Sequence, residues 1–487
     1  MRCVLAAPLR LVRLQTPLRP RAASVRASSQ HFTSLGLSDA VVTALRKLGF
    51  AEPTPIQALA APPLLAGAHV VIAAETGSGK TFAYLAPLIS RLMASQGSAA
   101  VLCPNGMLAL QVAEAANSLT DSAGVPLLRA VALTPDLTLR AATAAGTPLV
   151  VCTPARLLEE VFEFSSGRWR THASPPAAAA LRTLVVDEAD MLLSGGFEAP
   201  MKRLVQLLDR AEQAEQAEEA EQAEASAPPP SSRQFVFAAA TVHSSGRRTP
   251  GEALRLGFPD AVWVEGPRLH RSAAQLVHAW TQLPDSREVE EEEEDVDELG
   301  LAVASALHAH AGGQAMVFVN SAALALRLAA HLGELGGLSV QPYCAEVPSS
   351  ERAASLAVFR AGQLSVLVCT DAAARGLDVP AVAHVVQAQF ALSAVDFLHR
   401  VGRTARAGAP GRVTSLFRAQ AAALVAAVRQ AVERGERVED AFSRKRSFRK
   451  KFKKFGESRR GVSDPEKAAR SAAAALKRGP PRARGLQ

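Results

Sequence analysis

Short apolar runs that alternate with longer amphipathic stretches narrow the possible folds of this chain more than any other feature. From about Phe32 to Val264 the strand-like runs are HVVIAA, AAVLC, LLRAVAL, PLVVCT, LRTLVVDEA and RQFVFAAAT. A second series follows with QAMVFVNS, LSVQPYC, LSVLVCTD, VAHVVQAQF and GRVTSLF. Strands that are separated by helices form parallel βαβ units. The sequence therefore predicts an α/β fold with two doubly wound parallel sheets.

Length and composition agree with two globular domains. The chain has 487 residues, more than one domain usually contains, and its 48% of hydrophobic residues can build two cores. The five cysteines are scattered without a CxxC pair, which indicates buried thiols in a reducing compartment. No apolar run reaches the roughly 18 residues that span a bilayer, so we expect no membrane insertion.

A glycine-rich turn directly follows the first strand-like run. The segment VVIAAETGSGKTFAYL places a strand, a loop and the start of an amphipathic helix in succession. Glycines let backbone N–H groups approach phosphates, a helix start favours negative charge, and a lysine can reach the β- and γ-phosphates. We therefore predict a nucleotide-binding loop in which Lys80 contacts phosphate and the Thr81 hydroxyl binds Mg²⁺. The loop residues are Ala74, which stands where the common pattern has glycine, and Glu75, Thr76, Gly77, Ser78, Gly79, Lys80 and Thr81.

Consecutive acids end another predicted strand, in LRTLVVDEADMLL. At the carboxyl edge of a parallel sheet, near a phosphate loop, Asp187 can hold the metal through water and Glu188 can orient or deprotonate the attacking water. An acidic strand end by itself is ordinarily a solvated loop start. Together with Lys80, the catalytic interpretation is favoured.

From Phe32 to about Arg418 the chain resembles the DEAD-box ATP-dependent RNA helicases. The motifs GFAEPTPIQ, AETGSGKT, TPARLLE, DEAD, TDAAARGLDVP and HRVGRTARAG carry this resemblance. It implies two tandem RecA-like domains that bind ATP and Mg²⁺ and close on RNA. It also implies RNA-stimulated ATP hydrolysis with local strand separation, and RNA contacts that fall on phosphates and 2′-hydroxyls.

The resemblance assigns roles to further residues. Catalysis is expected from the arginine fingers Arg403 and Arg406, which join Lys80, Asp187 and Glu188. The adenosine of ATP is expected to contact Phe32, Gln57 and Asp378. RNA is expected to contact Thr153, Pro154, Arg156, Arg352 and Thr370. Coupling between hydrolysis and duplex opening is expected from Ala240, Thr241, His399 and Arg400, the last two as interdomain contacts.

Several positions depart from the family pattern. In PNGMLAL a cationic RNA contact and its acid are missing, so we expect the first domain to grip RNA more weakly. Ala239 replaces the serine of the usual Ser-Ala-Thr segment, which makes unwinding less secure than ATP binding. The segment YCAEVPSSER also differs from the family, and glycine positions are occupied by Ala155 and Ala405.

Composition marks the boundaries between segments. We predict a first domain over 31–265, with a low-complexity Ala/Glu/Gln insertion at 209–232, and a second domain over 300–442. Between them, 266–299 contains EVEEEEE, a like-charge block that would repel itself in a core, so this segment is interpreted as an acidic linker.

Both ends of the chain are basic. Residues 1–30 contain arginine and serine but no acid, as in a mitochondrial presequence, with a disordered basic extension as the alternative. Residues 443–487 include SRKRSFRKKFKKF, which can bind RNA, serve as a nuclear or nucleolar address, or be a solvated tail. The net charge of +8 favours polyanionic partners, either nucleic acid or an anionic membrane surface.

These ends resemble those of the vertebrate mitochondrial family members linked to assembly of the large mitoribosomal subunit. The resemblance implies structured rRNA and ribosome assembly intermediates as partners and a monomer when free. It implies a location in the mitochondrial matrix, in RNA granules or near the nucleoid, with the nucleus or nucleolus as a competing location. The alternative to a helicase is an ATP-gated RNA clamp or assembly platform that unwinds little. A DNA helicase or a metabolic P-loop kinase fits the motifs less well.

Overall fold

The computed structural model describes most of the two predicted domains. The described residues are 31–75, 77–95, 97–134, 136–165, 168–171, 181–193, 197–222, 233–242, 249–266, 275–284, 296–309, 312–374, 379, 382–405 and 409–443. The chain separates into two compact units, Met1–Leu269 and His270–Gln487, here called unit 1 and unit 2. The basic ends, the acidic run EVEEEEE, Thr76, Asp378 and Arg406 lie outside the described residues.

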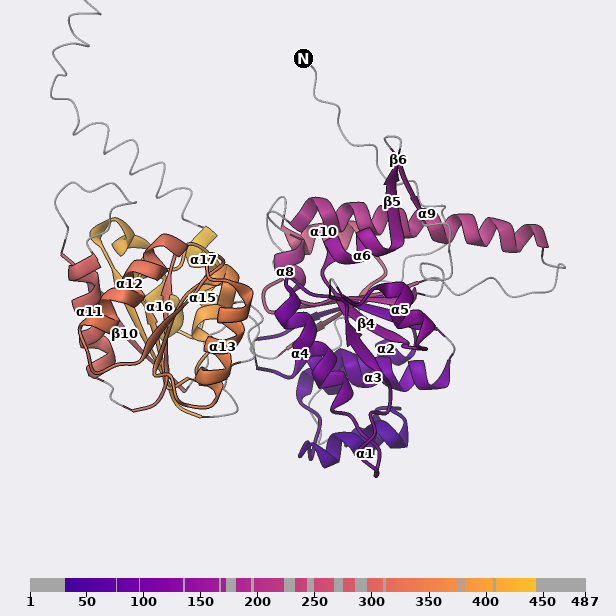
Figure 1. The fold of residues 1–487 in the computed structure, drawn as a ribbon, viewed down its shortest axis with the longest axis horizontal. Helices are drawn as coiled ribbons and strands as arrows, with labels where there is room; N and C mark the ends of the chain where they lie inside the picture. Colours follow the sequence, from indigo (N-terminus) through magenta and orange to yellow (C-terminus); the bar gives the residue numbers. More distant parts are fainter. Residues whose placement is uncertain are drawn as a thin grey trace, which may run out of the picture. The chain divides into compact units, whose positions relative to one another are not determined.

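Unit 1 is built on a seven-stranded parallel sheet (Figure 1). Its order is β3-β4-β2-β7-β8-β1-β9, and every neighbouring pair runs parallel. The strands are β1 (Val70–Ala73), β2 (Ser98–Leu102), β3 (Ala130–Ala132), β4 (Leu149–Cys152), β7 (Leu181–Val186), β8 (Gln234–Ala239) and β9 (Val262–Glu265). The central strands are buried on both faces, which is why they appear in the sequence as continuous apolar runs.

Helices cover both faces of this sheet. Leucine, isoleucine and alanine side chains of α1 (Asp39–Lys47), α2 (Pro55–Leu65), α3 (Lys80–Ala94) and α4 (Gly106–Asn117) pack on one face. The other face carries α5 (Leu139–Ala144), α6 (Pro154–Val161), α8 (Ala189–Leu192), α9 (Glu198–Gln222) and α10 (Pro250–Gly257). A short 3₁₀ helix, η1 (Phe32–Ser34), precedes α1. Figure 1 shows the two helical layers with the sheet between them.

Unit 2 repeats this architecture around a six-stranded parallel sheet with the order β10-β15-β14-β11-β13-β12. Its strands are β10 (Leu276–Gln282), β11 (Ala315–Val319), β12 (Val340–Tyr343), β13 (Val366–Thr370), β14 (His384–Gln387) and β15 (Gly411–Phe417). Its helices are α11 (Val296–His308), α12 (Ala322–Glu334), α13 (Ser349–Arg360), α14 (Asp371–Ala374), α15 (Ala394–Val401), η3 (Ala419–Ala421), α16 (Ala422–Glu433) and α17 (Val438–Ser443). The α/β fold with two parallel sheets is therefore confirmed.

The interpretation of 266–299 as linker is wrong for part of that segment. It contains β10, which pairs with β15 along its whole length, and the first turn of α11. The edge strand β10 is only partly buried, and its sequence LVHAWTQ includes polar residues, so it lacks the continuous apolar run that marked the central strands. The edge strand β9 was also not predicted, because its apolar run VWV is short.

Two other local features go beyond the sequence interpretation. The Ala/Glu/Gln segment from 209 onward begins as a continuation of α9, which runs to Gln222 and extends past the body of unit 1 in Figure 1. A hairpin of β5 (Phe162–Ser165) and β6 (Arg168–Thr171) follows α6. The four described cysteines are free and buried, as expected. Among the described residues, no helix combines the length and apolar character needed to cross a membrane.

Candidate active site

Strand order brings the predicted motifs of unit 1 to one edge of its sheet. In the order β4-β2-β7-β8-β1 all strands are parallel, so their carboxyl ends face the same way. The phosphate loop follows β1, the segment with Thr241 follows β8, Asp187 follows β7 and Thr153 follows β4. The carboxyl edge of an open parallel sheet is where such folds bind ligands. The nucleotide residues and the first-domain RNA residues therefore share one edge.

The phosphate loop is held compact by its own lysine and serine. Lys80 Nζ donates hydrogen bonds to the carbonyls of Ala74, at 2.7 Å, and Glu75, at 3.0 Å. Ser78 Oγ also donates to the Glu75 carbonyl, at 2.7 Å. Gly77 and Gly79 adopt φ of 81° and 90°, in the left-handed region that favours glycine. Among the described side chains none caps the start of α3, which leaves its dipole and first amides to a phosphate.

Gln57 joins the adenine-motif helix to the phosphate loop. Its Oε1 accepts from the Thr54 amide at 2.9 Å, and the Gln57 amide donates to Thr54 Oγ1, which forms a capping box at the start of α2. Gln57 Nε2 donates to the Gly79 carbonyl at 3.3 Å. A Cβ on Gly79 would lie 2.7 Å from Gln57 Nε2, so only glycine permits this approach. The side chain predicted to contact adenine thus sits against the loop predicted to hold phosphate.

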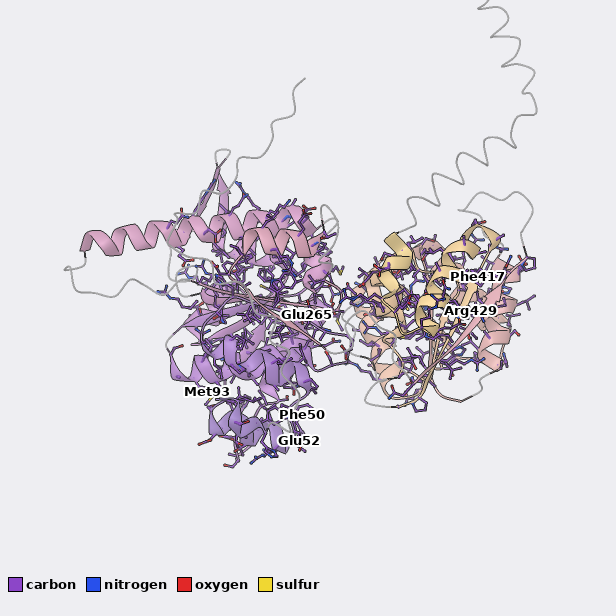
Figure 2. All side chains as sticks on the ribbon, turned by 180° about the vertical axis from the view of Figure 1, so that it is seen from behind. Phe50, Glu52, Met93, Glu265, Phe417 and Arg429 are labelled. Atoms are coloured by element: carbon purple, nitrogen blue, oxygen red, sulfur yellow. The ribbon has the colours of Figure 1, made fainter. Side chains whose placement is uncertain are left out.

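The predicted aromatic contact, Phe32, has a different environment. Phe32 is 3% exposed and belongs to the core under α1 and α2, so its ring supports the fold from within. The half-buried rings nearest to the loop in sequence are Phe82, which directly follows Thr81, and its partner Phe50, with centroids 5.1 Å apart. Figure 2 shows Phe50 beside Glu52. An accessible aromatic surface in this region is therefore provided by Phe50 and Phe82.

The acids at the end of β7 are buried and held by hydrogen bonds. Asp187 Oδ2 accepts from the Tyr84 hydroxyl at 2.9 Å, and Oδ1 accepts from the Glu188 amide at 2.9 Å. Burial, and next the nearby charge of Glu188, raise the pKa of Asp187 to about 7, although Tyr84 and Lys80 act in the opposite direction. A cation bound beside a buried carboxylate and a second acid stabilises their ionised forms, so cation binding is favourable at such a position.

Glu188 has a strained backbone. Its φ of 49° lies in the left-handed region, where only Glu188 and Ala405 are found among the described non-glycine residues. A non-glycine residue there costs roughly 1–2 kcal/mol, and such strain concentrates at functional sites. The geometry turns the chain from β7 into α8 directly at the predicted catalytic acid.

Asp190, the last acid of the DEAD run, connects to the segment after β8. Its Oδ2 accepts hydrogen bonds from both the amide and the hydroxyl of Thr241, the amide at 2.9 Å. Asp190 and Thr241 are 4% and 2% exposed, and Ala240 is also buried. The physical link between the hydrolytic acids and the coupling segment is therefore present although Ala239 replaces the usual serine.

The donor set fits Mg²⁺. Carboxylate and hydroxyl oxygens are the ligands that this cation prefers, and Asp187 and Thr81 supply both types. Burial is the main cause of the raised pKa of Asp187, and a bound cation would stabilise the ionised form that burial disfavours. Asp187 and Thr81 are therefore the residues that would hold the ion.

The first-domain RNA residues form a helix start. Thr153 Oγ1 accepts from the Arg156 amide at 3.3 Å and caps α6, whose first residue is Pro154. The Arg156 guanidinium pairs with Glu160 at 2.6 Å and donates to the Thr134 carbonyl at 3.1 Å. In the altered segment PNGMLAL, Asn105 caps α4 by accepting from the Leu108 amide at 2.9 Å. A contact between Arg156 and RNA would have to compete with Glu160.

Arg400 ties three strand ends of unit 2 together. It is fully buried, and its Nε and Nη2 donate to both oxygens of Asp371 at 2.7 and 2.6 Å. Nη2 also donates to Asn320 Oδ1 at 2.7 Å, and Nη1 donates to the Gln389 carbonyl at 2.6 Å. All these partners belong to unit 2, so Arg400 positions the loops after β11, β13 and β14. Its predicted interdomain contact stays a prediction.

Four other predicted residues of unit 2 are described: Arg403, His399, Thr370 and Arg352. Arg403 is 3% exposed, and its Nε donates to the His399 carbonyl at 3.3 Å, while His399 is itself buried at the end of α15. Thr370 ends β13, and Arg352 lies half-buried on α13. Arg403 acting as a finger, and the RNA contacts of Thr370 and Arg352, stay predictions.

The two alanines at family glycine positions differ. Ala155 lies in the first turn of α6 and does not have positive φ, so this change is mild. Ala405 has φ 52°, a conformation that glycine adopts without strain.

Tyr84 and Asp190 are functional candidates that the sequence interpretation missed. Tyr84 follows Lys80 by four residues, and residues four apart share one face of a helix. This spacing could have indicated that Tyr84 points toward the same strand ends. Asp190 follows Asp187 within the motif, but the spacing of the motif alone gives no sign of its bond to Thr241.

A glycine loop at the start of α3, buried acids at the end of β7 and a second parallel-sheet unit define a P-loop nucleotide hydrolase. Residues 54–249 match the DEAD/DEAH box helicase family and residues 296–408 match the helicase conserved C-terminal domain. The chain is 38% identical to DEAD-box ATP-dependent RNA helicase 22 of Oryza sativa, over 88% of this chain and 84% of that protein. It belongs to the DEAD-box ATP-dependent RNA helicases, enzymes that hydrolyse ATP and act on RNA.

Two further similarities are more distant. The ATP-dependent rRNA helicase rrp3 of Aspergillus terreus is 28% identical, over 87% of this chain and 82% of that protein. The structure of Mss116p bound to ssRNA and AMP-PNP aligns with a TM-score of 0.66 over 85% of this chain and 80% of that one. Its sequence identity is 20%, so this likeness concerns the fold.

Proposed function

We propose that this protein couples RNA-stimulated ATP hydrolysis to local opening of RNA duplexes or remodelling of ribonucleoproteins during assembly of the large mitochondrial ribosomal subunit. The observation that carries the coupling is the Asp190 carboxylate, which accepts from the amide and the hydroxyl of Thr241. A change at the hydrolytic acids is thereby transmitted to the segment after β8. This favours a helicase over an ATP-gated RNA clamp or assembly platform.

The residues of unit 1 have distinct tasks in hydrolysis. Lys80 exchanges its two carbonyl acceptors for phosphate oxygens, and its charge opposes the negative charge that develops there. Glu188 orients the attacking water and takes its proton. Mg²⁺, held by Thr81 and through water by Asp187, would neutralise phosphate charge when bound. Arg403 and Arg406 would add positive charge from unit 2.

RNA selection follows from backbone recognition. The start of α6 after Thr153 and the start of α4 after Asn105 present the positive ends of their helix dipoles to a phosphate. Such contacts do not read base sequence. We therefore expect little sequence preference, with the RNA target set by location and protein partners.

The arginine-rich start, the basic tail and the similarity to a relative named as an rRNA helicase support ribosomal RNA and assembly intermediates as partners in mitochondria. The nucleus or nucleolus is the competing location, and the protein is expected to be monomeric when free. Crosslinking in cells followed by sequencing of the bound RNA separates these alternatives. Enrichment of mitochondrial large-subunit rRNA supports the proposal, whereas nuclear transcripts alone would overturn it.

Thr241→Val tests the helicase against the clamp. The variant removes the hydroxyl that donates to Asp190 and keeps the shape of the side chain. Purified full-length protein should hydrolyse ATP faster with RNA than with matched DNA and separate a short duplex. Thr241→Val should retain RNA-stimulated hydrolysis and lose much of the strand separation. Strong RNA-stimulated hydrolysis without strand separation by the unmodified protein would support the clamp instead.

A further inference from the structure

The Tyr84 hydroxyl meets the predicted metal-binding carboxylate. Tyr84 lies on α3, one turn after Lys80, and is 1% exposed. Its hydroxyl donates to Asp187 Oδ2 at 2.9 Å, while Asp187 Oδ1 accepts from the Glu188 amide at 2.9 Å. A helix of the phosphate loop and the backbone of the DEAD run thus each hold one oxygen of the carboxylate. Two hydrogen bonds to different oxygens fix the rotation of a carboxylate group.

Packing alone does not account for this hydroxyl. The Tyr84 ring lies in the core between α3 and the sheet, among buried apolar side chains such as Ile72, Ile89 and Val185. A phenylalanine ring would fill the same space. Burying a hydroxyl is unfavourable unless it forms a hydrogen bond, and the partner observed here is Asp187. The hydroxyl therefore acts on the carboxylate, whereas the ring serves the core.

We propose that Tyr84 is a positioning residue for Mg²⁺ binding at Asp187. The Tyr84 hydroxyl holds the Asp187 carboxylate in the orientation in which the carboxylate accepts hydrogen bonds from the water molecules bound to Mg²⁺. Because Tyr84 lies on α3, this orientation is linked to the helix that carries Lys80 and Thr81. Partners of metal ligands have this effect in other proteins, and their loss costs about 10–100-fold in metal affinity. Because Asp187 would bind the ion through water, we expect the lower end of that range.

The test is Tyr84→Phe in the full-length protein, with binding of a fluorescent ATP analogue measured at increasing Mg²⁺ and again in excess EDTA. The Mg²⁺ concentration at half-saturation should rise about tenfold, and affinity in EDTA should stay as in the unmodified protein. Tyr343→Phe is the matched control. Tyr343 is the only other tyrosine in the chain, is 2% exposed and lies in β12 of unit 2, so its Mg²⁺ dependence should not change.

The alternatives have different outcomes. An unchanged Mg²⁺ requirement in Tyr84→Phe overturns the proposal, and so does an equal loss of affinity with and without Mg²⁺, because that indicates a role in loop shape. The proposal rests on Asp187 as an Mg²⁺ ligand, which Asp187→Asn tests separately. If Asp187→Asn also leaves the Mg²⁺ requirement unchanged, the assignment of the metal site has failed rather than the role of Tyr84 alone.

Discussion

The strand ends of unit 1 converge on buried carboxylates, whereas those of unit 2 converge on a buried guanidinium. In unit 1 burial, and next the charge of Glu188, raise the pKa of Asp187 to about 7, so the ionised carboxylate is unfavourable there without a cation. In unit 2 Arg400 is matched by both oxygens of Asp371, by Asn320 and by the Gln389 carbonyl. At the carboxyl edge of the sheet, unit 1 therefore has acids that a cation would stabilise. In unit 2 the charge of Arg400 at this edge is already balanced by Asp371.

This difference distinguishes a unit whose buried charge can bind a ligand from a unit whose buried charge holds its own loops in place. A buried charge whose partners are all supplied by the protein fixes loops but has little capacity left for a ligand. A buried acid with incomplete compensation is unfavourable by itself and becomes favourable when a cation arrives. The proposed Mg²⁺ site therefore belongs to unit 1, whereas Arg400 holds the loops of unit 2 in place.

The largest expected effect is the loss of stability in Arg400→Met. Asp371, Asn320 and the Gln389 carbonyl would each lose a donor inside the protein, which costs about 3–5 kcal/mol when a buried pair is broken. The free energy of unfolding of unit 2, measured by hydrogen exchange in increasing denaturant, should fall by this amount while unit 1 is unaffected.

Arg429→Met is the control for this change. Arg429 pairs with Glu433 on the surface of α16 at 2.7 Å, with its side chain 56% exposed (Figure 2). Exposed pairs contribute about 0–1 kcal/mol, so little change is expected. Equal effects of the two substitutions would mean that the Arg400 cluster does not organise unit 2.

Glu188→Gln should give the next largest effect, in catalysis. Removing the base that takes the proton of water should slow RNA-stimulated hydrolysis about 100-fold or more. Stability should stay the same or rise slightly, because Glu188 contributes to the raised pKa of Asp187. Hydrolysis rate and thermal unfolding are measured on the same preparation. A variant that hydrolyses ATP at the normal rate would show that Glu188 is not the catalytic base.

The sequence predicted those parts of the molecule that depend on local patterns. Central strands are apolar along their whole length, and the glycine loop must follow a strand and start a helix, so both sheets and the position of Lys80 could be predicted. The strands β9 and β10 could not, because β9 has only a short apolar run and β10 includes polar residues, so neither stands out from a loop.

Contacts between distant segments were the part that the sequence could not supply. Phe32 lies in the core, Arg156 pairs with Glu160 and Arg400 pairs with Asp371, and the motifs alone indicated none of these contacts. The expected contacts of Phe32 with adenine, of Arg156 with RNA and of Arg400 with the other domain stay predictions. The Tyr84–Asp187 bond joins residues 103 positions apart, which no local pattern encodes.

A buried group in each unit, His278 in unit 2 and Asp187 in unit 1, should respond to pH in opposite directions. Burial lowers the pKa of His278, in the aromatic cluster with Trp280 and Phe397, to about 4. The ordinary pKa of histidine is 6.5, so the unfolded chain binds the proton more readily than the folded chain. The stability that neutral His278 contributes is therefore present above pH 6.5 and is lost as the pH falls toward 4. The loss amounts to at most about 3 kcal/mol.

Unfolding of unit 2 between pH 7 and 4 checks this expectation. His278→Phe should remove the acid-dependent component, while His308→Phe, at an exposed histidine of α11, should leave it. In unit 1, without Mg²⁺, the raised pKa of Asp187 adds stability below its ordinary value, which is lost as pH rises toward 7. An acid-dependent loss of stability of unit 2 that is unchanged in His278→Phe would contradict this expectation.

The smallest effects concern the backbone strain that each unit carries at one residue. In unit 1 the strained residue is Glu188, and function requires its side chain, but in unit 2 it is Ala405, whose methyl group has no evident task. Ala405→Gly relieves about 1–2 kcal/mol of strain and loses part of this to the greater freedom of glycine in the unfolded chain, so the free energy of unfolding of unit 2 should rise by about 0.5 kcal/mol.

Ala155→Gly is the matched comparison, because Ala155 is also at a family glycine position but lies in α6 with ordinary helical φ. It should destabilise unit 1 by roughly 0.5–1 kcal/mol. Denaturant unfolding of both variants measures whether each substitution raises or lowers the free energy of unfolding. A loss of stability in Ala405→Gly would show that the turn at Ala405, which lies close to Gly411, does not store strain.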